Sequence, residues 1–257
     1  MVRTAIQLYT LRHLEEDLPG TISRVGETGF DGVECYDAHF EVLTAPSTRD
    51  ATASALTDAG LELAGAHVGI DRLESDKEVV LEACRALGCT RLVIPSYPRE
   101  AFTTRDGIAT AADRLGALAA DLGRNGIELL YHNHTFEFGA VDSGIAFEYF
   151  VEHADGRFGF EPDVGLARHG GYDPIDLFEL VGGAAPLVHL TQTVPDDPER
   201  LHADPDEGVL DIGACADVAT ANGAEWLICE NGVTSDGMTS LARGDAAFSA
   251  LRSAVGS

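Results

Sequence analysis

The sequence predicts an α/β protein, a (β/α)₈ TIM barrel that forms a single domain over residues 1–257. Short apolar segments typical of strands alternate with amphipathic segments throughout the chain, which favours parallel strands joined by right-handed helical crossovers. The strand-like segments recur about every 30 residues, the step expected when a barrel of roughly 250 residues contains eight units. No linker or low-complexity stretch divides the chain.

Each predicted strand leads into a polar residue. The first runs from Arg3 to Tyr9, where Ile6 and Leu8 alternate with Gln7 and Tyr9. The other seven follow a glycine or small residue and are TGFDGVE ending at Glu34, AGLELAGAH at His67, LGCTRLVIPSY at Tyr97, NGIELLYHNH at His134, DGRFGFEPD at Asp163, GAAPLVHL near His189 and NGAEWLICE at Glu230.

The segments between the strands carry the three- and four-residue apolar spacing of helices. The clearest are Pro19 to Glu27, which has proline near its first turn, and Ala51 to Ala59, Asp76 to Leu87 and Arg105 to Asn125. Glycines at positions 60, 88, 126 and 223 fit the site just past a helix end, where the backbone is left-handed.

The longest predicted loop runs from Thr191 to Gly208, after the seventh strand, and is rich in proline and acidic residues. A long loop after a barrel strand usually covers the functional site, so we expect this one to do so. The alternative is a disordered, solvated loop.

The formal net charge is −26, and Lys77 is the single lysine among 17 basic residues. Dense carboxylates spread along a chain with almost no lysine are typical of a protein that stays hydrated in high salt. We interpret the charge as an adaptation to the saline cytoplasm of a halophilic microbe. Because there is no basic stripe to neutralise phosphates, the composition argues against a nucleic-acid partner.

No apolar run approaches the roughly 18 residues of a membrane span, and the N-terminus lacks the hydrophobic region of a signal peptide. We therefore expect a cytoplasmic protein without a membrane partner. The five cysteines form no CxxC pair, which favours reduced and mostly buried thiols. The sequence leaves the oligomeric state open.

In a parallel barrel the carboxyl ends of the strands meet at one mouth. The side chains expected there are a mixed set of imidazoles and carboxylates, suited to a divalent cation such as Mn²⁺, Co²⁺, Zn²⁺ or Mg²⁺. Without a cation, several of these carboxylates would have to stay protonated. Each residue also has a structural alternative, such as an ion pair, a helix cap or a hydrogen-bonded core histidine. The set is Glu34, His67, His132, His134, Asp163, His189 and Glu230.

Several motifs in the chain resemble those of the xylose isomerase-like TIM barrels, the sugar phosphate isomerase/epimerase group. The resemblance covers essentially the whole chain. Its most specific parts are YHNHTFEF, which matches the YHNHxxEF variant of the fifth strand, and DEGVLDI, which resembles a G-E-G-x-x-D segment after the seventh. Weaker matches are QLYTLR, GFDGVE and AHVG.

The resemblance implies one divalent metal ion held by His132, Asp163, His189 and Glu230. It further implies substrate contacts from strand-end residues, for which the candidates are Glu34, His67, Tyr97 and His134. Many relatives carry glutamate in place of His132, which leaves open whether His132 or His134 contacts the metal. Many also carry Lys-Asp where this chain has Thr191 and Gln192, so a phosphate contact from that lysine is missing.

By resemblance, the expected activity is isomerisation or epimerisation of a keto-sugar or polyol through an enediolate. The first candidate for the base is Glu230, with Glu137, Glu34 or His134 as the second proton carrier. If a β-hydroxyl leaves instead, the same enediolate makes the enzyme a dehydratase. A non-catalytic sugar-binding barrel or partner subunit is a further alternative. An apurinic endonuclease is disfavoured, because it needs a trinuclear zinc site and a basic surface.

Overall fold

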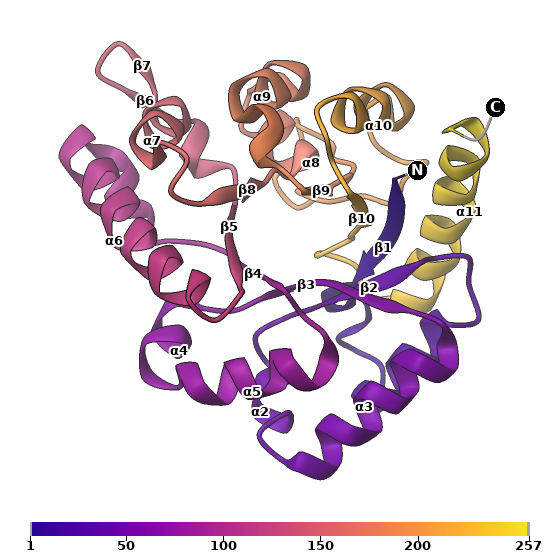
Figure 1. The fold of residues 1–257 in the computed structure, drawn as a ribbon. Coiled ribbons are helices and arrows are strands. Elements are labelled where there is room, and N and C mark those ends of the chain that lie inside the picture. The colour runs from indigo at the N-terminus through magenta and orange to yellow at the C-terminus, as the bar shows by residue number, and fades with distance from the viewer. Residues whose placement is uncertain (1, 256–257) are drawn as a thin grey trace.

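The computed structural model describes residues 2–255, with side chains up to residue 252. Eight parallel strands form one sheet in the order β8-β5-β4-β3-β2-β1-β10-β9, which curls into a nearly closed barrel with helices on its outside (Figure 1). The prediction of a single (β/α)₈ domain is confirmed.

The barrel strands are β1 (Arg3–Gln7), β2 (Gly32–Cys35), β3 (Glu62–His67), β4 (Arg91–Ile94), β5 (Glu128–His132), β8 (Gly159–Glu161), β9 (Leu187–His189) and β10 (Trp226–Cys229). A small antiparallel hairpin, β6 (Ala140–Val141) and β7 (Gly144–Ile145), lies outside the barrel. The helices are α1 (Leu18–Val25), α2 (His39–Val42), α3 (Pro46–Ala59), α4 (Ile70–Ser75), α5 (Lys77–Leu87), α6 (Arg105–Gly123), α7 (Ala146–Ala154), α8 (Val164–His169), α9 (Pro174–Val181), α10 (Ile212–Ala221) and α11 (Gly237–Val255). Short 3₁₀ turns are η1 (Leu8–Leu11), η2 (Arg99–Thr103), η3 (Phe136–Phe138) and η4 (Gly182–Ala184).

All eight predicted strands are present, although several end earlier than expected. β4 stops at Ile94 and β5 at His132, so the polar residues that follow belong to loops. Helix α3 begins at Pro46, earlier than predicted, because a proline in the first turn sets its start. The four glycines expected after helices, at positions 60, 88, 126 and 223, all have positive φ, between 67° and 95°. The five cysteines are free and buried, as predicted.

The sheet closes weakly between its first and last strands. No ladder joins β8 to β9 in the described chain, where the backbone pairing consists of one isolated parallel bridge between Asp163 and His189. The His189 amide there donates to the carbonyl of Pro162 at 3.0 Å. The strand pairing that closes the barrel is therefore this one bridge, which lies beside the mouth.

The strand alternation fills the barrel interior in layers. An apolar cluster inside the ring comprises Ala5, Ala64, Val93, Leu130, Leu187, Trp226 and Ile228. Alternate residues of a strand face the same side, so residues two positions further along also point inward. Those positions hold Gln7 after Ala5, His132 after Leu130, His189 after Leu187 and Glu230 after Ile228. An apolar floor thus lies beneath a polar layer.

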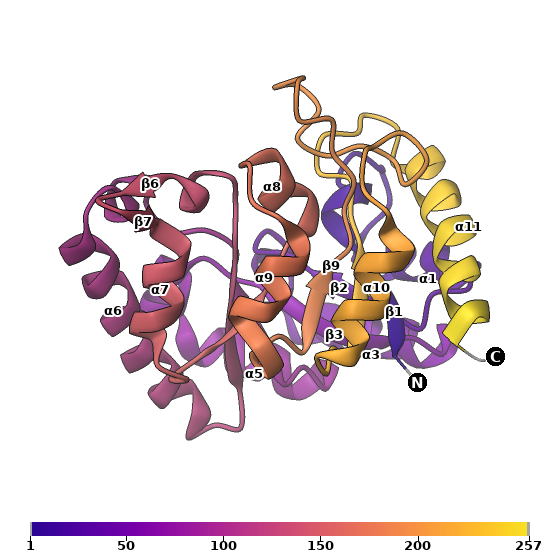
Figure 2. The same cartoon turned by 90° about the horizontal axis from the view of Figure 1, so that it is seen from above.

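The loops beyond the carboxyl ends of β9 and β10 lie together at the mouth, where Figure 2 shows them rising above the strands. Helix α11 packs beside β1, and Arg252 of α11 donates to the hydroxyl of Thr4 in β1 at 2.8 Å (Figure 1). Among the described helices, none has the length and hydropathy needed to cross a bilayer.

Candidate metal centre

A cavity of about 370 Å³ opens at the barrel mouth. Four of the predicted site residues, His67, His132, His134 and Glu230, contribute to its wall. The complete lining consists of Tyr9, Tyr36, Asp37, His67, Pro95, His132, His134, Leu166, Leu201, His202, Glu230, Gly232 and Val233. Leu201 and His202 come from the long loop after β9, so this loop covers part of the site, as expected from the sequence.

Three predicted ligands, Asp163, His189 and Glu230, converge at the mouth, where one donor atom from each lies within 4.8 Å of the others. The Nδ1 atom of His189 is 3.1 Å from Glu230 Oε2 and 3.9 Å from Asp163 Oδ2. All three residues are buried. Two carboxylates and an imidazole at these separations form a donor set that suits a divalent cation.

The local structure leaves one oxygen of Asp163 available. Asp163 caps helix α8, where its Oδ1 accepts the amide of Leu166 at 2.7 Å and the hydroxyl of Thr191 at 2.5 Å. Its Oδ2 is buried and has no hydrogen bond. A buried carboxylate oxygen without a partner is costly, and a cation would compensate it.

Glu34 orients the His189 ring. Its Oε2 lies 2.8 Å from His189 Nε2 and also accepts the side-chain amide of Gln7 at 2.8 Å. When the Nε2 proton is donated to Glu34, the Nδ1 lone pair faces Asp163 and Glu230. A carboxylate behind a histidine is the usual way in which proteins orient a metal-binding imidazole.

A second group of buried side chains lies below the first and is hydrogen-bonded. Glu161 Oε2 is 2.6 Å from His67 Nε2, 3.1 Å from His132 Nδ1 and 3.4 Å from His189 Nε2. Two atoms bound at ~2.1 Å to one cation at right angles would lie ~3 Å apart. The 2.6 Å contact is shorter than this, so we assign the group as a hydrogen-bonded network. The structure places His132, a predicted ligand, in this network.

The charges of the two groups also favour a cation. Burial raises the pKa of Glu161 to about 8, with the charge of Glu34 adding to the effect. Burial alone would lower the pKa of His67, but Glu34 and Glu161 raise it to about 10. Burial also opposes a proton on His189, yet the surrounding carboxylates raise its pKa well above the usual value. The carboxylates thus hold protons on their neighbours, and a divalent cation would replace part of that positive charge.

His202 is a site residue that the sequence analysis missed. Its Nδ1 accepts the backbone amide of Gly232 at 2.8 Å, so the neutral ring carries its proton on Nε2. That Nε2 lies 3.3 Å from Asp163 Oδ2. Nδ1 is used by the backbone and Nε2 carries the proton, so we assign His202 as a neighbour whose N–H faces Asp163 Oδ2 without a hydrogen bond in this structure, and not as a metal ligand.

The loop that carries His202 is tied to neighbouring elements through Asp204. The Asp204 carboxylate accepts Asn231 Nδ2 at 2.8 Å, the Ser240 hydroxyl at 2.7 Å and Arg243 Nη1 at 3.0 Å. Ser240 and Arg243 belong to α11, and Asn231 directly follows Glu230. The same carboxylate therefore fixes the loop relative to helix α11 and to the end of β10.

The family model described as "Xylose isomerase-like TIM barrel" matches residues 22–249 of the chain. This chain belongs to that family. No curated protein sequence matches the chain significantly.

Solved structures similar to this xylose isomerase-like barrel share its fold. A sugar phosphate isomerase/epimerase from Parabacteroides distasonis is 20% identical, with a TM-score of 0.73 over 95% of this chain and 92% of that one. A probable 3-DHS dehydratase from Bacillus anthracis is 11% identical, with a TM-score of 0.77 over 96% and 99%. The 3-keto-D-glucoside 4-epimerase of E. coli is 19% identical, with a TM-score of 0.68 over 98% and 100%.

Five predicted site residues of this xylose isomerase-like barrel do not line the cavity: Asp163 and His189, described above, and Glu34, Glu137 and Tyr97. Glu34 is fully buried below it. The Glu137 carboxylate accepts the Tyr131 hydroxyl at 2.8 Å and the His134 amide at 2.9 Å, and burial raises the pKa of Glu137 to about 7. The hydroxyl of Tyr97 accepts Arg114 Nη1 at 3.3 Å. Glu34 thus contacts the ring of His189, whereas Glu137 contacts the backbone of His134.

The strand-five histidines of this xylose isomerase-like barrel lie in different surroundings. His132 contacts Glu161, and burial lowers its pKa well below the usual value. His134 lies beyond the end of β5 in the cavity wall, and its buried Nδ1 has no hydrogen bond. Of the two histidines, His134 is thus the one whose ring nitrogen Nδ1 is buried without a partner.

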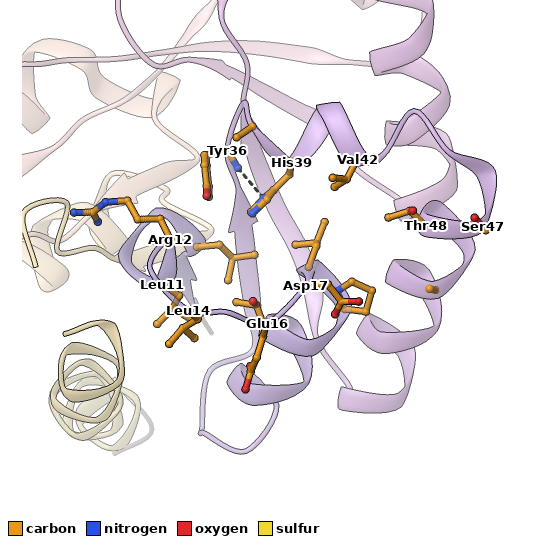
Figure 3. A pocket seen from close by; sticks show the side chains of 16 residues that line it. Leu11, Arg12, Leu14, Glu16, Asp17, Tyr36, His39, Val42, Ser47 and Thr48 are labelled. Atoms are coloured by element: carbon orange, nitrogen blue, oxygen red, sulfur yellow. Dashed lines mark hydrogen bonds between the residues drawn. The ribbon is translucent and has the colours of Figure 1, made fainter. Parts of the chain in front are cut away.

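A second cavity of about 460 Å³ lies beside the mouth of this xylose isomerase-like barrel and shares Tyr36 with the first. In Figure 3, Leu11 lies on one side of it and Val42 on the other, with Tyr36 and His39 between them. Its wall combines apolar residues of η1 and α1 with residues of α2 and α3. The Nδ1 of His39 accepts the backbone amide of Tyr36 at 3.3 Å, which requires an unprotonated nitrogen.

Acid should destabilise the protein through His39. Burial lowers the pKa of His39 from 6.5 to about 4. Between these values the unfolded chain binds more protons than the folded chain, so stability falls as the pH falls through this window. We expect His39 to contribute a loss of ~2 kcal/mol between pH 7.5 and pH 4.5, measured by urea denaturation.

A matched pair of variants isolates this effect. His39→Gln should lose ~2 kcal/mol less than the wild type over the same pH range, because glutamine has no proton to bind. His13→Gln changes an exposed histidine and should follow the wild type. An unchanged acid response in His39→Gln would show that burial of His39 is not the cause.

Proposed function

We propose that this barrel is a divalent-metal-dependent isomerase or epimerase that acts on a keto-sugar or polyol through an enediolate. The observation that carries the proposal is the convergence of Asp163, His189 and Glu230 beside a cavity of sugar size. Mn²⁺, Mg²⁺, Co²⁺ and Zn²⁺ all accept such donors. The sugar phosphate isomerase/epimerase and the 3-keto-D-glucoside 4-epimerase that share this fold support the same class of reaction.

Asp163, His189 and Glu230 would hold the ion, and His134 is the strand-five candidate for a further contact. When bound, the ion supplies Lewis-acid stabilisation of the negative charge that develops on the substrate oxygens. The residues around it fix the geometry. Glu34 holds the ring of His189, and Thr191 holds one oxygen of Asp163.

Glu230 is the proposed base. It lines the cavity, and although burial favours its neutral form, the hydrogen bond from His189 and the charges of His202 and His189 keep its pKa below the usual value. It is therefore ionised at neutral pH and able to remove the proton next to the substrate carbonyl. Positioned proton transfer of this kind is typically worth ~10²–10⁴-fold in rate.

His134 is the proposed second proton carrier. Of the three candidates from the sequence, Glu34 and Glu137 do not line the cavity, whereas His134 does. Burial lowers the pKa of His134, and its free Nδ1 is suited to accepting or returning a proton. Return of the proton to the opposite face of the same carbon gives epimerisation, and return to the neighbouring carbon gives isomerisation. His67 and His132 complete the wall as substrate contacts.

The experiment is proton exchange in D₂O with Mn²⁺-loaded protein and a panel of keto-sugars. We expect deuterium at the carbon next to the carbonyl, together with an isomer or epimer, and loss of both in Glu230→Gln. A dehydrated product would assign the protein to the lyases instead. Absence of deuterium and of any product across the panel, with metal bound, would refute the proposed activity.

We also propose a halophilic origin and a cytoplasmic location, from the net charge of −26. Mutual repulsion of surface carboxylates destabilises the folded state at low salt and is screened at high salt. The melting temperature should therefore rise by ~10 °C or more between 0.1 M and 2 M KCl. The melting temperature in sucrose of equal osmolality is the control for the general effect of an excluded solute. A melting temperature that does not respond to KCl would contradict the proposal.

A further inference from the structure

We propose that the cavity accepts an uncharged keto-sugar, free or with a neutral apolar substituent at the end remote from the metal, and discriminates against sugar phosphates. This inference rests on the proposed function and specifies its substrate class. It follows from what lines the cavity, what surrounds its wall and how the nearby backbone amides are used.

The cavity wall offers no cationic side chain of the kind that binds phosphate. Proteins bind phosphate through arginine or lysine and through free backbone amides. None of the described residues that line the cavity is arginine or lysine, and two of them, Asp37 and Glu230, are acidic. The His67 ring in the wall faces the buried carboxylates of Glu34 and Glu161, at 3.3 and 2.6 Å, which would compensate a positive charge on it.

Two arginines contact the wall, and both are engaged elsewhere. Arg72 forms a bidentate ion pair with Asp37, in which Nε lies 3.0 Å from Oδ1 and Nη2 lies 2.9 Å from Oδ2. Arg12 lies over the Tyr9 ring at 4.3 Å and donates to the carbonyls of Tyr9 and Thr234 at 2.8 and 3.0 Å. Each guanidinium holds the wall in place and is not presented to the cavity.

The loop after β9 adds no arginine or lysine to the described wall, since its Arg200 pairs with Glu207 at 2.8 Å and does not line the cavity. Thr191 donates to Asp163, and Gln192 bonds both to the amide of Leu210 at 2.9 Å and to its carbonyl at 2.7 Å. Gly208 packs so closely on Gln192 that a Cβ there would lie 2.0 Å from Gln192 Oε1. The side chains of Thr191 and Gln192 are therefore both held by hydrogen bonds within the protein.

Backbone amides near the cavity are also used. The Gly232 amide donates to His202 Nδ1, and the Val233 amide donates to Asn231 Oδ1 at 3.3 Å. The Gly69 amide donates to Asp37 at 2.9 Å. A phosphate dianion in this cavity would thus lose its hydration without gaining charged or backbone donors, which is costly.

The wall offers an apolar surface in place of these donors. Tyr9 is 40% exposed and Val233 is 44% exposed, and Tyr36, Leu166 and Leu201 also contribute to the wall. The rings of Tyr9 and Tyr36 meet edge to face at 5.2 Å, which fixes their positions. Tyrosine rings and aliphatic side chains pack well against the C–H faces of a sugar or an apolar substituent.

The test compares matched ligands on the Mn²⁺-loaded protein. For each of four keto-hexoses, the free sugar, its 6-phosphate and its 6-O-benzyl ether are measured by calorimetric binding and by proton exchange in D₂O. We expect the free sugar and the ether to bind at least ~10-fold more tightly than the phosphate and to exchange faster. Tighter binding of the phosphates would overturn the inference.

The two proposals fail in different ways. Exchange with the phosphates and not with the free sugars would overturn the substrate class and support the reaction. Absence of exchange with every ligand would refute the reaction, and the calorimetric order would still decide the substrate class.

Variants add an internal control. Val233→Arg places a cation in the wall and should improve 6-phosphate binding ~10-fold or more, because it restores the missing donor. Val209→Arg adds the same charge at an exposed residue that does not line the cavity and should leave phosphate binding unchanged. Tyr9→Ala should weaken binding of the benzyl ether more than binding of the free sugar, because the ring that packs against the substituent is removed. Equal phosphate binding in both arginine variants would contradict the inference.

Discussion

Asp163→Ala should abolish stoichiometric metal binding and lower turnover by ~10³-fold or more, since a Lewis-acid centre is worth several kcal/mol. The substitution removes the buried Oδ2 that has no hydrogen bond and leaves His189 and Glu230 as two donors. Elemental analysis of the purified protein measures the first effect, and proton exchange in D₂O measures the second. His189→Ala should also lose the metal.

The control for Asp163→Ala is a second helix-capping aspartate. Asp163 caps α8 through the Leu166 amide, so its loss also weakens a helix start. Asp173 caps α9 through the Ile175 amide and lies away from the cavity lining. Asp173→Ala should lose similar helix stability and retain a full equivalent of metal. Metal loss in both variants would mean that folding, rather than ligation, is being measured.

His202→Ala should weaken metal affinity by ~10–100-fold, the range found when a partner of a metal ligand is removed. Its Nε2 is the donor that faces Asp163 Oδ2, and no other described side chain is within 3.5 Å of that oxygen as an ion-pair partner. Metal titration in the presence of a chelating indicator gives the affinity, and kcat and KM show whether substrate binding changes as well.

Variants of the loop contacts distinguish the effect of the His202 ring itself from the effect of its position. Asp204→Ala keeps the imidazole but removes the contacts to Asn231, Ser240 and Arg243, so it should reproduce part of the loss. Arg200→Gln breaks one exposed ion pair in the same loop, with Glu207, and should have little effect. Wild-type metal affinity in His202→Ala would remove this residue from the proposed site.

Strand alternation made the fold and most of the mouth predictable. Apolar runs that end in a polar residue, repeated eight times, specify a parallel barrel. His132 and His189, the last residues of β5 and β9, and Glu230, directly after β10, reach the mouth. The same alternation contained the signal for Glu161, which lies two positions before Asp163 and therefore on the same face. No site candidate was placed at the inward position before Asp163, so Glu161 was not predicted.

The sequence did not reveal how deep in the barrel each site residue lies or how the loop that carries His202 folds. The stagger of neighbouring strands sets how far inside the ring each residue lies, so Glu34 is buried below the cavity although its segment also ends in a polar residue. His202 depends on a loop fixed by contacts far apart in the sequence, such as Asp204 with Arg243. Local patterns carry no information about such contacts.

The isolated bridge that joins the two ends of the sheet connects Asp163 to His189, and these are two of the residues proposed to bind the ion. Ion uptake and ring closure would then be one linked equilibrium, in which each event favours the other by the same free energy. A cell short of the ion would lose intact protein as well as catalysis, because opened rings are substrates for proteolysis. The supply of divalent ion would thereby set the lifetime of this protein.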